Sequence, residues 1–182
     1  MVNSEEILET IKMVKIEQLD IRTGTLGINL LDCAKNDVGH TCERITDKIF
    51  DKAGDSVEIV NGVQEDFGIP IVNKRIAVTP ISLIINALGM PSKKAAVKIA
   101  TTLDEAAEDL SIDFIGGYTA LVHRAASLGD NMLIESIPEA MEATDRLCSS
   151  VVVASTRDGI NMDEILRMGR IIKKTSEVSD TG

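Results

Sequence analysis

The sequence has very few aromatic residues. Its 182 residues include no Trp, one Tyr and three Phe, although 44% are hydrophobic. The core must therefore be aliphatic, and the aromatic platforms on which single-stranded nucleic acids stack are missing. The 19 basic and 29 acidic residues give a formal net charge of −10, spread evenly along the chain without a basic stripe. This charge pattern argues against a nucleic-acid partner.

Long hydrophobic runs are missing too. The longest uncharged stretch, Ile76 to Ser92, is interrupted by Pro80 and Pro91, whereas a membrane-spanning helix needs about 20 predominantly apolar residues. The first residues lack the basic start and apolar stretch of a secretion signal. Three cysteines without a Cys-x-x-Cys pair are typical of a reduced protein rather than of a disulfide framework. We therefore expect a cytoplasmic protein that has no membrane partner.

Short β-rich runs alternate with helical patterns along the whole chain. The sequence predicts strands at Leu19–Leu31, Ile71–Thr79, Ile112–Ile115 and Cys148–Ala154, each followed by helical residues. Strands that alternate with helices indicate a parallel sheet with helical crossovers. The predicted fold class is α/β, and we treat residues 1–182 as a single α/β unit.

The helices are marked by capping patterns and by one proline. Helical residues from about Asn131 contain Pro138, which indicates a kink or a fresh helix start. Capping residues are expected at the starts of three helices: Asn3 with Glu6, Ser92, and Asn161 with Glu164.

Ligands of parallel α/β folds bind beyond the carboxyl ends of the strands. In this chain the residues predicted there are rich in hydroxyls and poor in paired carboxylates. They are Asp32 and Cys33 after the first strand, Thr79 and Ser82 after the second, Tyr118, Thr119 and His123 after the third, and Ser155, Thr156 and Arg157 after the fourth.

The chemistry-bearing residues form no recognised catalytic or metal motif. Cys33 is either a reactive thiol or, more simply, a core residue like Cys42, because nothing near it in sequence lowers its pKa. His40 and His123 lack the spacing partners of a zinc site, so no metal site is predicted. The P-loop, Gly-x-Gly-x-x-Gly and Gly-x-Ser-x-Gly motifs are missing, and the sequence identifies no cofactor.

Two polar segments suit an anion. The loop from Ser155 to Gly159 leads into a helix and offers hydroxyls, a guanidinium and backbone N–H groups; an ordinary strand-to-helix turn is the alternative. Charges at Asn73–Arg75 and at Arg22 are unexpected inside buried parallel strands. They face either solvent or a polar interior, and in a polar interior Arg22 becomes the best anion anchor.

Several segments, in order along the chain, carry a family resemblance. They are Asp20–Thr23, Leu30–Cys33, Gly68–Arg75, Val78–Leu83, Asp113–Gly117, Cys148–Ser150, Ser155–Thr156 and Gly159–Met162. Together they resemble domain of unknown function 711 (uncharacterised protein family 0210), a prokaryotic family.

The resemblance implies an architecture but no reaction. The family is grouped with pyruvate formate-lyase-like barrels, in which two parallel half-barrels enclose the active site, and a polar interior would explain Arg22 and Asn73–Arg75. Family members are more than twice as long, so the chain resembles their N-terminal portion. Four strands cannot close a barrel, and we expect the chain to associate with itself or with the missing C-terminal part.

The expected function is that of an enzyme acting on a small anionic metabolite inside an α/β barrel, with Cys33 as the candidate reactive group. The alternatives are a non-catalytic metabolite-binding or regulatory protein and an inactive N-terminal fragment. The predicted ligand-binding residues are Arg22, Asn73, Lys74, Arg75, Thr79, Ser82, His123, Ser155, Thr156 and Arg157.

Overall fold

The structure is a computed structural model that describes residues 3–17 and 20–178. Its sheet has four strands in the order β1-β2-β3-β4, all parallel, and a small antiparallel ribbon of β5 and β6 follows. The strands are β1 (Ile21–Ile28), β2 (Ile71–Val78), β3 (Phe114–Leu121), β4 (Leu147–Val152), β5 (Ala154–Ser155) and β6 (Gly159–Ile160). The helices are α1 (Ser4–Ile11), α2 (Val38–Ala53), α3 (Ser56–Phe67), α4 (Ile81–Asn86), α5 (Lys93–Asp109), α6 (Leu128–Glu142) and α7 (Met162–Val178), with a π-helical turn at Lys12–Ile16 and a 3-10 turn at Leu31–Cys33.

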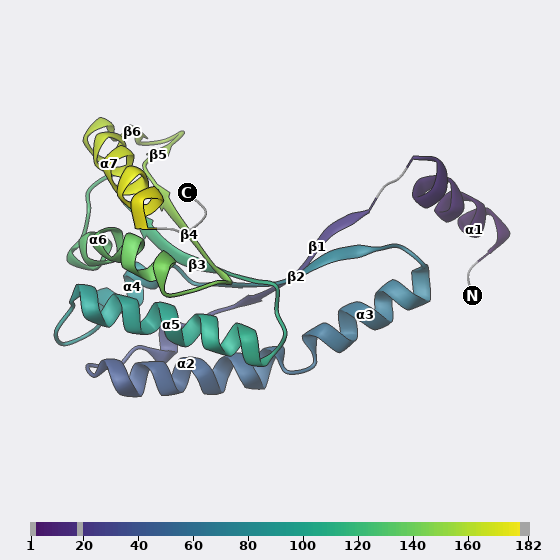
Figure 1. The fold of residues 1–182 in the computed structure, drawn as a ribbon, viewed down its shortest axis with the longest axis horizontal. Helices are drawn as coiled ribbons and strands as arrows, with labels where there is room; N and C mark the ends of the chain where they lie inside the picture. The colour runs from purple at the N-terminus through teal and green to yellow at the C-terminus, as the bar shows by residue number, and fades with distance from the viewer. Residues whose placement is uncertain (1–2, 18–19, 179–182) are drawn as a thin grey trace.

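The predicted α/β class and parallel sheet are confirmed. Helices connect each strand to the next, as the alternation of patterns indicated (Figure 1). Strand β1 is shorter than the predicted run from Leu19 to Leu31, and Leu19 lies outside the described residues. Within those residues, no helix combines the length and the apolar character that crossing a bilayer requires.

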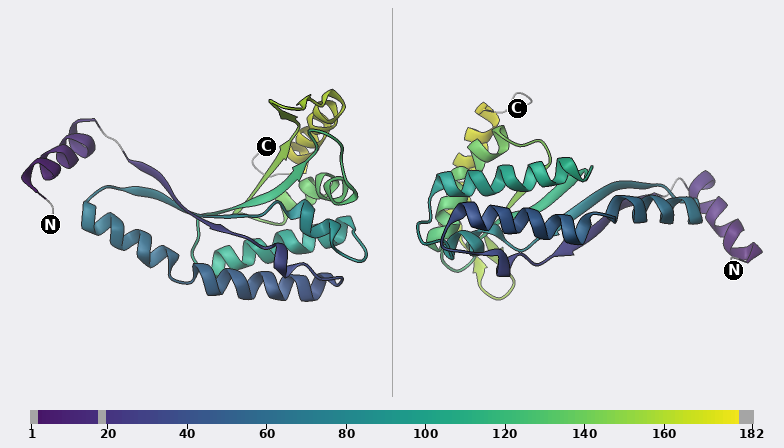
Figure 2. Two further views of the ribbon diagram at one scale, coloured as in Figure 1. Left: turned by 180° about the vertical axis from the view of Figure 1, so that it is seen from behind. Right: turned by 90° about the horizontal axis from the view of Figure 1, so that it is seen from below.

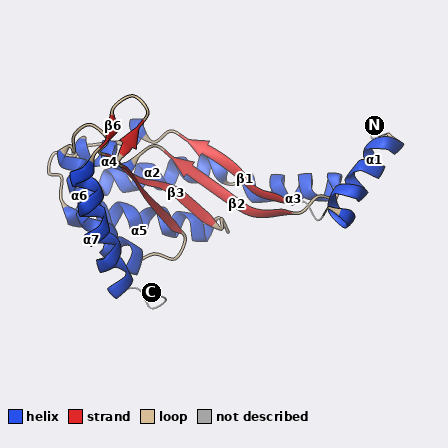
Figure 3. Cartoon of the chain, turned by 90° about the horizontal axis from the view of Figure 1, so that it is seen from above, coloured by secondary structure: helices blue, strands red, loops and turns tan. Residues whose placement is uncertain are grey.

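The helices lie on one face of the sheet and leave the other face bare. Seen from above, the strands lie in front of α2, α3 and α5 (Figure 3), and from below the same helices cover the sheet (Figure 2, right). The aliphatic core fills the space between sheet and helices and includes Ile76, Ile99 and Leu103, all with 0% exposure. Parallel sheets are normally covered on both faces, so this arrangement is consistent with half of a barrel.

Strand β3 differs from its prediction. It does not end at the Gly116-Gly117 pair but continues through it to Leu121, because a bulge between Gly116 and Tyr118 lets the strand stay paired with β4. Gly117 has φ +126°, and a Cβ there would lie 2.6 Å from the carbonyl oxygen of Val78; only glycine fits. The extra residue turns Tyr118 into the core, where it is fully buried, so Tyr118 and Thr119 do not follow the strand.

Helix α6 also differs from its prediction. It begins at Leu128 rather than near Asn131 and passes through Pro138 without interruption. A capping box sets the earlier start: the Ser127 hydroxyl accepts from the Asp130 N–H, and the Asp130 carboxylate accepts from the Ser127 N–H. The predicted caps at Asn3, with Glu6, and at Ser92 are confirmed.

Part of the chain extends away from the helical body. The first halves of β1 and β2 run out as a two-stranded ribbon with α3 beneath it, and α1 lies at its far end (Figures 1 and 2). Helices α1 and α3 contain no buried residue. Their exposed apolar side chains include Leu8, Ile59 and Phe67, so this part of the chain presents apolar surface to solvent.

Candidate functional site

The residues on the bare face of the sheet can be identified because side chains alternate between the two faces along each strand. In β2, Ile76 and Val78 are buried against the helices, so Arg75 and Asn73 point to the opposite face. Residues that pair across a parallel sheet share a face, and Thr25 pairs with Arg75. We call the hydrogen-bonding side chains of this surface the polar face: Thr23, Thr25, Asn73, Arg75, Thr119 and Ser150.

The side chains of the polar face are connected to one another and to the backbone. The hydroxyls of Thr23 and Thr25 lie 3.2 Å apart, and those of Thr119 and Ser150 lie 2.7 Å apart. The Asn73 amide donates to the Arg22 carbonyl at 3.1 Å. These contacts orient hydroxyls and an amide on a surface that would otherwise be uniformly apolar.

Arg75 is the cation of this face. Its guanidinium lies over Gly116 of β3: a Cβ added to Gly116 would be only 2.9 Å from Nη2 of Arg75. Ala77 pairs with Gly116, which pairs in turn with Cys148 of β4, so the guanidinium lies beside a partly exposed thiol. No carboxylate among the described residues forms an ion pair with Arg75.

The charge of the sheet is opposite to that of the chain. Strands β1 to β4 carry Arg22, Lys74 and Arg75 and contain no acidic residue, although the whole chain has a net charge of −10. A fixed cation with no internal counter-ion attracts anions, and a guanidinium can bind carboxylate or phosphate in a bidentate manner. The polar face is therefore suited chemically to a small anion.

Two predicted ligand-binding residues of β1 and β2 point to the opposite face of the sheet. Arg22 lies two residues before Gly24, and Lys74 pairs with Gly24, so all three lie on the same face of the sheet. A Cβ added to Gly24 would contact Val60 of α3 at 3.0 Å. The side chains of Arg22 and Lys74 therefore point toward the helix-covered face. A strand places successive side chains on opposite faces, so the Asn73–Arg75 cluster is divided between the two.

The carboxyl end of β2 uses its predicted polar residues internally. The Thr79 hydroxyl accepts from the Leu30 N–H at 2.9 Å and contacts Oδ1 of Asn29 at 3.1 Å, which fastens the chain after β1. The Ser82 hydroxyl is fully buried in α4. Neither group is free on the surface to bind a ligand as the structure stands.

The carboxyl ends of β3 and β4 meet in a second cluster. His123 Nε2 lies 3.7 Å from the Asp158 carboxylate, which also accepts from Arg124 and from the Ser155 hydroxyl, both at 2.8 Å. The Ser155 hydrogen bond is the main cause of a lowered Asp158 pKa, and Arg124 adds to it. Nδ1 of His123 is buried without a partner among the described residues.

The loop after β4 is a hairpin rather than a plain turn. Residues 154–160 form the ribbon of β5 and β6, in which the Ser155 hydroxyl and the Asp158 N–H bind each other, while Thr156 and Arg157 are exposed. The Asp158 carboxylate accepts from the Ser155 hydroxyl, which was predicted to bind an anion. Of the predicted capping box at Asn161, one half is present: the Glu164 N–H donates to Asn161 at 3.4 Å.

The environment of Cys33 does not favour a thiolate. Its side chain is 1% exposed, and its sulfur donates to the Arg44 carbonyl at 3.5 Å. Burial raises the pKa of the thiol, and the neighbouring Asp32 carboxylate raises it further. Its catalytic role stays a prediction that this geometry does nothing to support.

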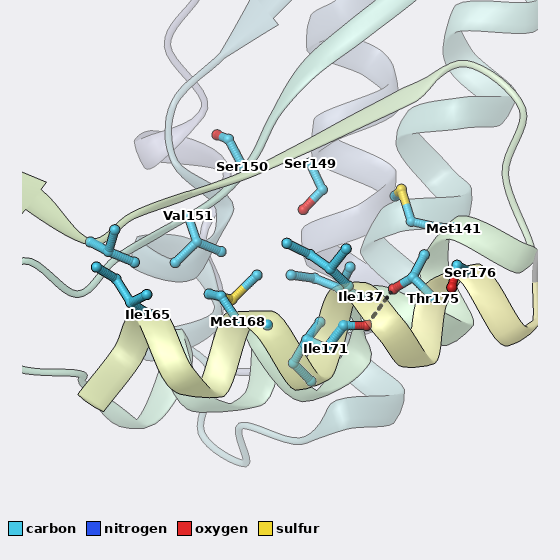
Figure 4. A pocket seen from close by; sticks show the side chains of 13 residues that line it. Ile137, Met141, Ser149, Ser150, Val151, Ile165, Met168, Ile171, Thr175 and Ser176 are labelled. Carbon is cyan, nitrogen blue, oxygen red and sulfur yellow. Dashed lines mark hydrogen bonds between the residues drawn. The ribbon is translucent and has the colours of Figure 1, made fainter. Parts of the chain in front are cut away.

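A large groove lies on the helix side of β4 and shares Ser150 with the polar face. It has a volume of about 750 Å³ and lies between β4, α6 and α7 (Figure 4). Its walls are aliphatic side chains and hydroxyls, without a charged residue: Ile137, Met141, Ser149, Ser150, Val151, Val153, Ile165, Met168, Ile171, Ile172, Thr175 and Ser176, together with Gly169. These walls have hydroxyls but no cation to attract an anion, so we place the candidate site on the polar face.

Nothing in the described residues resembles a metal centre. No three His, Cys, Asp or Glu side chains there come together in a way that would hold an ion. Sequence reasoning missed Thr23, Thr25 and Ser150 as site residues, as well as Arg124 and Asp158, and it placed Thr119 after its strand. The available signal for Thr23 and Thr25 was the alternation of side chains along β1, and for Thr119 it was the extension of β3 through its glycines.

Comparison with known proteins gives a consistent result. The model of the family described as "Uncharacterised ACR (DUF711)" matches residues 12–182. The chain is 53% identical over 175 residues to a UPF0210 protein of Thermoanaerobacter sp. (strain X514), and the match covers 96% of this chain and 38% of the relative. It is 53% identical over 181 residues to a UPF0210 protein of Methanocaldococcus jannaschii, covering 97% of this chain and 40% of the relative. The chain thus spans about two fifths of the length of these relatives.

Proposed function

Since this chain belongs to the uncharacterised DUF711 family, we propose that it binds a small anionic metabolite on its polar face and forms the substrate-binding part of an α/β barrel enzyme. The observation that carries the proposal is Arg75: an exposed guanidinium, free of ion pairs among the described residues, held over Gly116 on a face without carboxylates.

The binding chemistry follows from the arrangement of the polar face. The planar guanidinium supplies two parallel N–H donors to a carboxylate or phosphate. The Thr25 hydroxyl, directly across from Arg75 in the register, can bind a further polar atom of the ligand. Covering this face with additional protein would remove water and strengthen the charge–charge attraction.

The polar face holds an anion but carries few reacting groups. Its members are threonines, a serine, an asparagine and an arginine, with the Cys148 thiol beside them. General acid–base chemistry normally needs a His, Glu, Asp, Lys or Tyr within hydrogen-bond reach. In the enzyme, those groups would come from the additional sequence that the longer relatives possess.

The same observation favours a second candidate function, which is metabolite binding without turnover. The two candidates differ in a simple measurement: an enzyme converts the ligand that stabilises it, whereas a binding or regulatory protein returns it unchanged. Turnover must be assayed on a relative of full length, since the chain spans only 38% to 40% of the relatives.

The binding proposal is tested by thermal unfolding in the presence of inorganic phosphate, pyrophosphate, malonate and citrate. A ligand that binds only the folded state raises Tm in proportion to the logarithm of its concentration. We expect at least one of these anions to raise Tm, and Arg75→Gln to abolish the rise. Arg22→Gln, which removes an exposed arginine from the other face of the same sheet, should keep it. Equal effects of the two substitutions would contradict the proposal.

A further inference from the structure

The Arg75 side chain reaches across the sheet toward a pair of hydroxyls. Arg75 pairs in the register with Phe114 of β3, but its guanidinium lies over Gly116, two residues further toward the carboxyl end of that strand. The next side chains on this face beyond Gly116 are those of Thr119 and, on β4, Ser150. The cation and the hydroxyl pair therefore follow one another along β3 and β4.

The distance between the two groups follows from the strand repeat. Gly116 pairs with Cys148 of β4, and Ser150 lies two residues further along that strand. At about 3.3 Å per residue, the hydroxyls lie roughly 6–7 Å beyond the guanidinium. An anion bound to Arg75 can reach them with a second group that a chain of about three atoms joins to its charged end.

The sheet carries only small side chains at the level of the guanidinium. Gly27, Ala77, Gly116 and Cys148 pair in one row across all four strands. A Cβ added to Gly27 would meet no atom within 4 Å, and Cys148 is only partly buried. The row selects no ligand by itself, but it leaves room for a carbon chain beside the guanidinium.

The hydroxyl pair is best matched by a hydroxyl of the ligand. The Thr119 and Ser150 oxygens lie 2.7 Å apart, and neither has another hydrogen-bond partner among the described residues. One O–H is used between them, so the other O–H and several lone pairs stay available. A ligand hydroxyl can accept from this O–H and donate to a lone pair, whereas a carboxylate only accepts and an ammonium only donates. Ser150 is exposed and points away from α7 (Figure 4), so a ligand can approach the pair.

We propose that the anion bound by Arg75 carries a hydroxyl about three atoms from its charged group and that the Thr119–Ser150 pair recognises this hydroxyl. The ligand class is then a short hydroxylated phosphate or carboxylate. The inference rests on the proposed function, because Arg75 must hold the charged end. It also fixes the orientation of the ligand: the charge lies over Gly116, and the hydroxyl lies toward the carboxyl ends of the strands, where parallel α/β folds bind their ligands.

Ligands that differ only in their hydroxyls test the inference. Dissociation constants for the 182-residue chain are measured by thermal shift for glycerol 3-phosphate against propyl phosphate, and for 4-hydroxybutyrate against butyrate. We expect the hydroxylated member of at least one pair to bind about fivefold more tightly, which is what one net hydrogen bond contributes. The two pairs together show whether phosphate or carboxylate is the preferred charged group.

Neighbouring serines of β4 provide a matched control. Ser150→Ala and Thr119→Val should bring the ratio of the two dissociation constants close to one, while the ligand without hydroxyls binds as it does to wild type. Ser149→Ala removes a hydroxyl from the other face of the strand, where it donates to the Tyr118 carbonyl at 3.0 Å, and should leave the ratio unchanged.

The possible failures of the two proposals can be told apart. Equal binding of hydroxylated and plain ligands, or a ratio that persists in Ser150→Ala and Thr119→Val, would overturn the inference and leave anion binding by Arg75 intact. Binding of phosphate or malonate without binding of either hydroxylated ligand would overturn it too. A chain that binds none of these anions would contradict the proposed function, and the inference with it.

Discussion

The guanidinium of Arg75 in β2 lies directly over Gly116 in β3, at a position where any other residue would place its Cβ 2.9 Å from Nη2. The glycine thus determines where the only charge of the polar face is held. The next residue, Gly117, is a glycine for another reason: its φ of +126° and its contact with the Val78 backbone leave no room for a side chain. The two neighbours therefore have separable roles.

Alanine substitutions should separate the two roles. Gly116→Ala meets only the end of a flexible side chain, so unfolding free energy should change by less than about 1 kcal/mol, while anion binding weakens as Arg75 is displaced. Gly117→Ala meets backbone at 2.6 Å in a strained conformation and should cost about 2 kcal/mol or more. Urea unfolding of both variants, with the thermal-shift assay on Gly116→Ala, checks this. Similar destabilisation by the two substitutions would contradict the assignment.

The three cysteines should react with iodoacetamide at very different rates. Cys33 and Cys42 are buried, and burial raises the pKa of both thiols, whereas Cys148 is partly exposed beside the polar face. We expect Cys148 to be alkylated at least about tenfold faster than the other two at neutral pH, because the thiolate is the reacting form. Peptide mass spectrometry over a time course measures the rates. A Cys33 that reacts as fast as Cys148 would restore it as a candidate nucleophile.

The buried Tyr118–Ser136 hydrogen bond has a defined direction. The Ser136 hydroxyl donates to the Leu133 carbonyl at 2.6 Å, so the Tyr118 hydroxyl donates to Ser136. Tyr118→Phe removes the donor and leaves Ser136 bonded, at a cost of about 1 kcal/mol. Ser136→Ala leaves the Tyr118 hydroxyl buried without its partner and should cost more, up to about 3 kcal/mol. Denaturant unfolding of the two variants measures both losses of unfolding free energy. A larger loss in Tyr118→Phe than in Ser136→Ala would show that the donor is wrongly assigned.

The buried Asp130 should make the free energy of unfolding depend on pH in the acid range. Burial alone works to raise its pKa, but hydrogen bonds from the Ser127 hydroxyl and the Leu121 N–H, with a smaller contribution from the Ser127 N–H, outweigh burial and hold the pKa below its usual value. A carboxyl whose pKa is lowered by folding stabilises the protein above its unfolded pKa and loses this contribution as pH falls through the folded pKa. Stability should therefore drop below about pH 4, and Asp130→Asn should be less stable at pH 7 with a shallower loss in that window. A parallel pH dependence in both proteins would refute this.

Much of the fold followed from the sequence because its signals are local. The Ser92 cap, the Asn3–Glu6 capping box and the predicted strand at Ile71–Thr79 each depend on neighbouring residues. The passage of β3 through Gly116 and Gly117 was not predictable in this way, because a bulge is stabilised by pairing with β4 and by contact with Val78.

The candidate site was predicted only in part, because the sequence did not show which face of the sheet each strand residue points to. Arg22, Lys74 and Arg75 are equivalent as charges in a strand, and their faces depend on which neighbours are buried. Arg75 is placed by the burial of Ile76 and Val78, which a sequence pattern with mixed apolar and polar residues does not determine. Thr119 was predicted to follow its strand rather than to lie within it, and the predicted strand Cys148–Ala154 did not show which face Ser150 takes.

The most direct test of the account compares two alkylating reagents at Cys148. Iodoacetate is an anion and iodoacetamide is neutral, and both alkylate the same Cys148 thiolate. Cys148 pairs with Gly116, over which the Arg75 guanidinium lies. If Arg75 attracts anions to the polar face, the ratio of the iodoacetate rate to the iodoacetamide rate at low ionic strength should fall about threefold or more in Arg75→Gln. The ratio should be unchanged in Arg22→Gln. An equal ratio in wild type and Arg75→Gln would contradict the claim that this face is an anion-binding surface.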